Sequence, residues 1–151
     1  MRLSAKADYA IRAAVELAAG GEEHVKADRI AAAQDIPLRF LEHILLDLKH
    51  AQLVESRRGA EGGYRLARPA DEVTLADVLR AVEGPLANVR GARPETLEFS
   101  GSAEALREVF VALRASIRTV LERVTLAAVA SGELPDVVHE LTREPDAWSP
   151  R

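Results

Sequence analysis

Arginines and glycines concentrate in one short segment of the chain. Residues 57–68, with the sequence RRGAEGGYRLAR, hold four arginines against a single acidic residue, Glu61. Guanidinium groups pair with phosphates and with guanine edges, and glycine permits the positive φ angles that a tight loop requires. The pattern indicates a basic loop suited to a nucleic acid. Its candidate contact residues are Arg57, Arg58, Gly59 and Arg65.

A second group of side chains follows Pro37. Leu38, Arg39, Glu42 and His43 fall on the first turns of an expected helix. In a DNA major groove an arginine can bond guanine bidentately, and a glutamate can accept a hydrogen bond from the amino group of cytosine. A histidine can reach a base or a phosphate. Simple solvation is the alternative explanation for these charged side chains, as for any exposed helix face.

Other kinds of chemistry lack a matching pattern. The chain contains no cysteine, which excludes a disulfide framework, a thiolate metal site and a cysteine nucleophile. The four histidines are isolated; His43 and His50 share a helix face but have no third ligand at a supporting spacing. A phosphate-binding glycine loop and a nucleophile elbow are also missing. The sequence therefore predicts no enzyme, no metal site and no cofactor.

The net charge of −4 is unevenly distributed along the chain. Residues 1–68 hold eleven basic and ten acidic side chains, whereas residues 69–151 hold nine and fourteen. Because salt confines charge effects to about 8–10 Å, the local basic segment matters more for binding than the total. No stretch approaches the roughly 20 apolar residues of a membrane span. The N-terminus also lacks the pattern of a secretory signal, so we expect a cytoplasmic protein without membrane contact.

Apolar periodicity and capping residues predict the elements that carry these side chains. The spacing predicts helices at 4–19, 27–34 and 37–51, with Ser4 capping the first and Pro37 at the first helical position of the third. Alternating residues predict strands at 53–56 and 64–66, joined as a hairpin. Thr74 and Asp77 have capping-box spacing, which predicts a helix that ends near Glu83. The third helix is expected to bury Phe40, Leu41, Ile44, Leu45 and Leu48.

A longer apolar repeat occupies the C-terminal third of the chain. Alternating spacings of four and three residues, the pattern of a coiled-coil seam, continue for about three heptads within an expected helix at 103–131. A short neighbouring helix cannot cover so long a stripe, so the pattern favours pairing with a second copy. The expected dimer residues are Leu106, Phe110, Leu113, Ile117, Val120 and Val124.

Together these elements predict a mainly α fold with a small β-hairpin wing, that is, a winged helix-turn-helix followed by a long dimerisation helix. We expect a DNA-binding domain at 1–86, a loop at 87–102, and the dimerisation helix with a C-terminal tail at 103–151. In such an arrangement the third helix fits the major groove and the hairpin tip reaches an adjacent groove.

Three segments resemble the Rrf-two family of bacterial winged-helix regulators. They are MRLSAKADYAIRA, IPLRFLEHILLDLKHAQLVESRRGAEGGYRLARP and TLADVLRAVEGPL, which together cover most of the first 86 residues. The resemblance implies that Lys6 and Tyr9 of the first helix lie near phosphates. It further implies that Arg39 and Glu42 face bases and that Arg58 enters the minor groove. It also implies a homodimer, built on the long helix, that recognises a roughly palindromic operator in double-stranded DNA.

The chain departs from the cluster-bearing members of that family in the loop before the long helix. Those members carry cysteines, or mixed cysteine, histidine and acidic ligands, whereas this loop reads GARPETLEFSGS. Asp8 stands where some relatives supply an acidic ligand, but one carboxylate cannot hold an iron–sulfur cluster. We interpret Asp8 as a charge that complements the helix dipole. The effector is left open between a small metabolite, a protein partner and none.

Two functional hypotheses follow. The first is a sequence-specific DNA-binding transcription regulator, expected to be a repressor, which works as a homodimer without an iron–sulfur cluster. The alternative is a winged-helix module that binds protein and has little or no affinity for DNA, and the acidic C-terminal half motivates it. The salt dependence of DNA binding discriminates between them, since neutralising several phosphates makes affinity fall steeply with salt.

Overall fold

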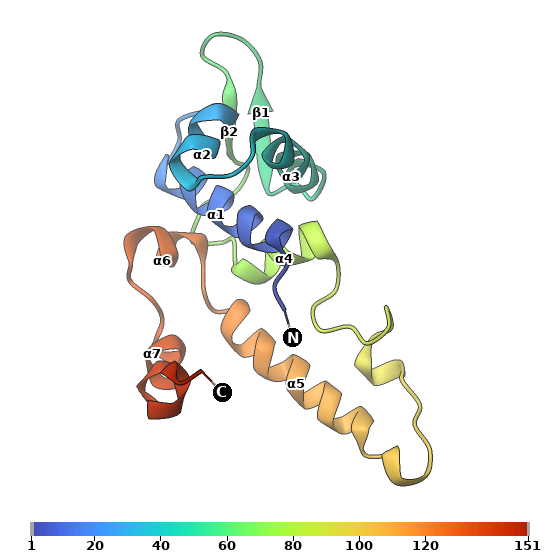
Figure 1. Ribbon diagram of the computed structural model, residues 1–151. Coiled ribbons are helices and arrows are strands. Elements are labelled where there is room, and N and C mark those ends of the chain that lie inside the picture. Colours follow the sequence, from blue (N-terminus) through green and yellow to red (C-terminus); the bar gives the residue numbers. More distant parts are fainter. Residues whose placement is uncertain (1, 151) are drawn as a thin grey trace.

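The computed structural model describes residues 2–150, which form seven α-helices, a two-stranded sheet and three short 3-10 turns. The hairpin and the first three helices lie at one end, and a helix extends away from them at the other (Figure 1). A mainly α fold with a small hairpin wing is thus confirmed. In chain order the helices and strands are α1 (Ala5–Ala19), α2 (Ala27–Gln34), α3 (Leu38–His50), β1 (Val54–Arg57), β2 (Gly63–Leu66), α4 (Leu75–Glu83), α5 (Leu106–Leu121), α6 (Leu126–Ser131) and α7 (Asp136–Arg143).

Local side-chain caps begin α1 and α4 where the sequence predicts them. The Ser4 hydroxyl accepts a hydrogen bond from the backbone N–H of Ala7 at 3.0 Å. The Thr74 hydroxyl accepts from the N–H of Asp77 at 3.2 Å, and the Asp77 carboxylate accepts from the N–H of Thr74 at 3.0 Å. These bonds satisfy backbone donors that have no partner inside the helix. The predicted cap and capping box are both confirmed.

A tight reversal joins α2 to α3. Asp35 adopts a left-handed conformation with φ of 50°, and the N–H of Ile36 donates to the carbonyl of Ala31 at 3.0 Å. Pro37 has φ −57° and ψ 124° and precedes α3, which begins at Leu38. The prediction of Pro37 as the first helical residue was therefore wrong by one position. Its fixed φ still suits the entry to the helix.

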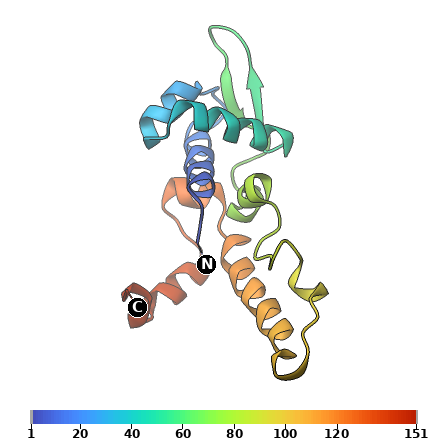
Figure 2. The ribbon, with the colours of Figure 1, turned by 45° about the vertical axis from the view of Figure 1, so that its right-hand side comes forward.

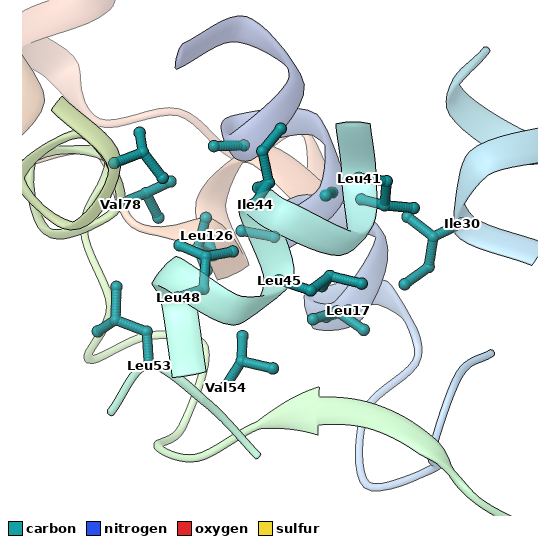
Figure 3. Packing of buried hydrophobic residues seen from close by; sticks show 14 of the residues in the cluster. Leu17, Ile30, Leu41, Ile44, Leu45, Leu48, Leu53, Val54, Val78 and Leu126 are labelled. Carbon is teal, nitrogen blue, oxygen red and sulfur yellow. The ribbon is translucent and has the colours of Figure 1, made fainter. Parts of the chain in front are cut away.

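The hydrophobic core forms between α3 and the helices α1, α4 and α6 (Figure 3). The buried face of α3 is made of Leu41, Ile44, Leu45 and Leu48, a spacing that keeps one side of a helix inward. Phe40 is 42% exposed. The prediction that the helix buries Phe40 with these residues was wrong: Phe40 lies at the edge of this face, about 100° from Leu41, and its ring meets Tyr9 of α1.

Alanines form most of the buried face of α1, the helix that contacts α2, α3, α4 and α6. Small side chains allow neighbouring helix axes to approach closely. The central position of α1 therefore depends on its alanine-rich face. The buried residues of α1 are Ala7, Ala10, Ala13, Ala14 and Leu17.

The hairpin of β1 and β2 is anchored to the helical domain by a third short segment. The strands pair antiparallel, with Glu55 opposite Arg65 and Arg57 opposite Gly63. Val25 and Tyr64 exchange two backbone hydrogen bonds of 2.8 Å on the other side of β2. This bridge fixes the base of the hairpin to the segment between α1 and α2. The wing tip between the strands projects away from the domain (Figure 2).

The helix predicted at 103–131 is divided into two helices. Residues 106–121 form α5, a turn follows, and the Thr125 hydroxyl caps α6 by accepting from the N–H of Ala128 at 3.1 Å. The N–H of Leu75 donates to the carbonyl of Val124 at 3.0 Å, and the N–H of Leu126 donates to the carbonyl of Val73 at 2.9 Å. Pairing with the segment before α4 thus ends the helix, and the prediction of one continuous helix was wrong.

The break places α6 in the hydrophobic core that α1, α3 and α4 share. Leu126 is fully buried in the cluster that α1 and α3 line, and Val124 is 3% exposed. Val124 was predicted to continue the dimer seam, and that prediction was wrong because its side chain is buried within its own chain. The unit that holds α3 in place therefore includes residues far beyond position 86.

The C-terminal part of the chain packs loosely on the rest. The helix α7 contacts α5, and a 3-10 turn at Pro145–Trp148 follows it. The indole N–H of Trp148 donates to the carbonyl of Thr142 at 2.7 Å, while the side chain stays 78% exposed. Within residues 2–150, no helix combines the length and apolar character that a membrane crossing requires.

Candidate nucleic-acid interface

The N-terminal turns of α3 present a solvent-facing surface. Leu38 is 44% exposed, and Arg39, Glu42 and His43 are exposed beside it. Arg39 and Glu42 form no ion pair with a described residue, so their charges are available to a ligand. The opposite face of the same helix is locked into the core. A rigid helix therefore presents these four predicted residues together.

The side chains of α1 extend this surface at one edge. Lys6 pairs with Asp47 of α3 at 2.8 Å. The ring of Tyr9 is half-buried and meets the ring of Phe40 edge-on, with a centroid distance of 5.6 Å. The guanidinium carbon of Arg12 lies 5.0 Å from the centroid of the Tyr9 ring. Lys6 and Tyr9 are thus held directly against the exposed side of α3.

The wing tip carries two arginines on a constrained loop. Arg57, Arg58 and Gly59 are exposed, and neither arginine forms an ion pair with a described residue. Gly59 has φ of 106°, in the region that favours glycine. A Cβ at Gly62 would lie 2.2 Å from the carbonyl oxygen of Arg57, so only glycine fits there. The loop therefore folds tightly on itself and holds both guanidinium groups outward.

Arg65 differs from the other predicted basic residues. It is half-buried, and its guanidinium pairs with Glu55 at 2.5 Å across the hairpin and with Glu22 at 3.6 Å. Cross-strand pairs of opposite charge stabilise a hairpin. We therefore assign Arg65 first to holding the base of the wing.

Two basic residues near this surface escaped the sequence prediction. Arg12 donates to Asp8 at 2.7 Å and to the carbonyl of Gln34, and so ties α1 to the end of α2. Lys49 is exposed on the last turn of α3 and donates to the hydroxyl of Ser56 at 2.7 Å. The helical spacing of Arg12 from Asp8 was readable in the sequence, but its tie to Gln34 joins separate elements and was not. Asp8 lies in the first turn of α1, as its predicted role at the helix dipole requires.

The helix α5 carries an apolar stripe that its own chain covers only in part. None of its sixteen residues is buried, and Leu106 and Leu113 are 39% and 48% exposed. Phe110, Ile117 and Val120 are half-buried and line a groove of about 710 Å³ that also reaches Leu79 of α4. Five of the six predicted dimer residues therefore lie on α5, and only Val124 does not.

Comparison with known proteins agrees with this geometry. A family model described as Rrf2, iron-dependent transcriptional regulator, matches residues 3–132. Rv1287 of Mycobacterium tuberculosis (strain H37Rv), named as an HTH-type transcriptional regulator, is 55% identical over 142 residues, which are 93% of this chain and 88% of that protein. The HTH-type transcriptional regulator CymR of Bacillus subtilis is 35% identical over 132 residues, covering 87% and 91% of the two chains.

Solved structures show the same fold. The structure of CymR, the global cysteine regulator of B. subtilis, superposes with a TM-score of 0.74 at 34% identity and covers 87% of this chain and 98% of that one. T. potens IscR superposes with a TM-score of 0.72 at 32% identity and covers 87% of this chain and 88% of that one. The winged-helix fold predicted from the sequence is therefore confirmed.

The description of the family model mentions iron, but the residues present do not fit an iron–sulfur cluster. Such clusters are held mainly by cysteine thiolates, and the whole sequence contains none. Within residues 2–150, no group of three or more histidine, aspartate and glutamate side chains is arranged to hold a metal ion. In the segment at 88–105, Arg93 and Glu95 instead line a pocket.

The family model covers most of the chain, and full-length relatives and superposed structures agree on one kind of protein. The chain therefore belongs to the Rrf2 family, the Rrf-two family that its sequence resembles, and is a DNA-binding transcriptional regulator rather than an enzyme.

Proposed function

We propose that the protein is a repressor that binds a roughly palindromic DNA operator as a homodimer, without an iron–sulfur cluster. The observation that carries the proposal is the joint exposure of the first turns of α3 and of the wing tip at the same end of the molecule (Figure 2). In this proposal α3 enters the major groove, where Arg39 and Glu42 read base edges. Leu38 and His43 flank those contacts.

The wing supplies the second contact in this proposal. Arg58, with Arg57 beside it, enters the minor groove, whose negative potential increases where the groove is narrow. Gly59 allows the backbone to approach the sugar–phosphate chain closely. Lys6 and Tyr9 lie near phosphates at the edge of α3, where an arriving phosphate would replace Asp47 as the partner of Lys6. Such contacts position the protein, and those of α3 and the wing tip specify the sequence.

The dimer of the proposal forms along α5. The partly exposed stripe of α5 supports pairing with a second copy, because removing apolar surface from water on both helices lowers the free energy. Its residues are Leu106, Phe110, Leu113, Ile117 and Val120. A two-fold pair would present two copies of α3 to two half-sites, which explains why a palindrome is expected.

A binding experiment tests this function. We expect purified protein to protect two symmetric half-sites, about one helical turn apart, in the DNA upstream of its own gene. Affinity should fall by orders of magnitude between about 50 and 200 mM salt, and transcription from the protected promoter should decrease when protein is added. Absence of DNA binding at low salt would contradict the proposal and favour the alternative, a winged-helix module that binds another protein.

A further inference from the structure

Four arginines converge on a pocket between α4, α5 and the segment that connects them. The pocket has a volume of about 280 Å³, and its basic residues are Arg80, Arg93, Arg114 and Arg118. Residues 69–151 contain only nine basic side chains in an acidic half of the chain, so almost half of them gather at this one place. Clustered like charges repel one another unless anions lie among them. The concentration therefore requires a physical explanation.

The protein's own acidic groups neutralise only part of this charge. Arg114 is 19% exposed and pairs with Glu95 at 2.5 Å. Arg118 donates to Glu122 at 2.9 Å, and Arg80 pairs with the same carboxylate. Two carboxylates thus face four guanidinium groups.

Arg93 makes no hydrogen bond to either carboxylate, although its charge acts on Glu95 from a greater distance. It is exposed at the start of the 3-10 turn at Pro94–Thr96 and forms no ion pair with a described residue. Within the pocket, its donors are therefore open to an incoming anion.

The pocket wall is fixed before any ligand arrives. The segment between α4 and α5 folds back as a small hairpin, in which Val89 and Ala92 exchange two backbone hydrogen bonds of 3.0 Å. Pro94 is buried, and the turn that contains it packs on α5. A preformed wall lowers the entropy that a ligand must overcome on binding.

We infer that this pocket binds a small metabolite that carries at least two oxyanion groups, either an organic phosphate or a dicarboxylate. Guanidinium forks match both phosphate and carboxylate oxygens bidentately. Two acidic groups would balance the two uncompensated positive charges. The volume suits a compound smaller than a typical drug-sized ligand, for which pockets of about 300–1,000 Å³ are usual.

The pocket lies between α5 and α4, and α4 packs on the helices that carry the proposed DNA contacts. A ligand bound there is therefore linked to those contacts. Arg80 lies on the last turn of α4, which packs on α1 and α3, whereas Arg118 lies on α5. Glu122 joins these two arginines and so links the helices. An anion that competes with Glu122 would loosen this link and change the angle at which α5 holds the domain. This regulatory step rests on the proposed function, but binding of the anion does not.

Calorimetry on the full chain without DNA tests the site by itself. We expect saturable binding of pyrophosphate or of succinate at constant ionic strength, and whichever binds more tightly identifies the class of ligand. Arg93→Gln should weaken this binding about tenfold, the usual effect of losing a charge-assisted hydrogen bond. It should leave the fold intact, because the side chain has no ion pair. Arg90→Gln, an equal charge change in the same segment but outside the pocket, should have no effect.

Absence of saturable binding by both anions, or equal weakening by Arg90→Gln, would overturn the site. A second measurement addresses regulation. The better anion should shift the DNA affinity of the unmodified chain severalfold at constant ionic strength, and Arg93→Gln should abolish most of that shift. A shift that persists unchanged in Arg93→Gln would mean that the anion competes at the DNA surface, which overturns the coupling. Failure of DNA binding as such would contradict the proposed function and leave the calorimetric result standing.

Discussion

At the scale of single residues, the neighbours of each charged side chain decide what it can do. Arg58 and Arg65 are both basic residues of the hairpin, yet only Arg65 is satisfied by carboxylates of its own chain. Moving an unpaired guanidinium from water into a DNA groove costs little free energy, because the negative potential of the groove stabilises its charge. A paired one must first give up its partner. The exposed tip is therefore better suited to DNA than the base of the wing.

Arg58→Ala should weaken specific DNA binding by about 1–3 kcal/mol, because it removes a groove contact made by an unpaired guanidinium. The affinity for an operator fragment, measured by fluorescence anisotropy at fixed salt, checks this. Arg123→Ala removes an exposed arginine two residues after α5 and should leave affinity unchanged. Equal affinities of the two variants would exclude the wing tip from the interface.

At the scale of elements, the short helix α6 contributes more than its six residues suggest. Its backbone pairs with the segment before α4, and Leu126 fills the core beneath α1. The DNA-binding unit is therefore closed by a segment that follows α5. This connection ties the orientation of α5 to that of α3.

Leu126→Ala should lower the free energy of unfolding by about 2–5 kcal/mol, since it opens a cavity at a fully buried position. Urea denaturation followed by circular dichroism measures the change. The exposed Leu141 of α7 provides the control, because Leu141→Ala should change stability by less than about 0.5 kcal/mol. Similar unfolding midpoints for the two variants would mean that α6 does not belong to the core.

The apolar stripe of α5 leads to a second prediction at this scale. Leu113→Glu combined with Ile117→Glu should yield monomers, because burying carboxylates in an apolar interface is costly. Light scattering coupled to size-exclusion chromatography gives the mass directly. Ala115→Glu combined with Thr119→Glu places the same charges on the other side of α5 and should leave a dimer. A dimer that survives the first pair would refute pairing along this stripe.

At the scale of the whole molecule, ion pairs connect the DNA-binding unit to α5. The hydrogen bonds that Arg80 and Arg118 donate to Glu122 hold the pKa of its carboxyl below the ordinary range. The folded state therefore binds fewer protons there than the unfolded state, and this contribution to stability increases with pH. It is complete above the ordinary glutamate pKa of about 4.3 and is lost as pH falls through the lowered value.

Glu122→Gln should accordingly destabilise the protein at neutral pH, and the difference from the unmodified chain should shrink as the pH falls below about 4. Urea midpoints measured across this range test the pH dependence. Glu104→Gln, an exposed position without an ion pair to a described residue, should behave like the unmodified chain throughout. A difference for Glu122→Gln that stays constant with pH would show that the link does not depend on its charge.

The sequence by itself determined the local features of this protein. The caps at Ser4 and Thr74, the buried spacing of Leu41, Ile44 and Leu48, and the basic glycine-containing wing involve residues a few positions apart, so periodicity and capping rules reveal them. The same spacing also admits Phe40, four residues before Ile44, so the exposure of Phe40 could not be read from periodicity. Motif similarity over the first 86 residues added the family.

Only the tertiary structure decided where the helix with the long apolar repeat ends and which arginines lie beside it. The helical spacing continues through Val124, but backbone pairing with residues 73–75 and burial of Leu126 outweigh it, because a core contact contributes more than one further turn of helix. The arginine pocket likewise joins residues of α4, α5 and the segment between them. Such long-range contacts depend on how the chain folds back on itself, and no pattern of neighbouring residues encodes them.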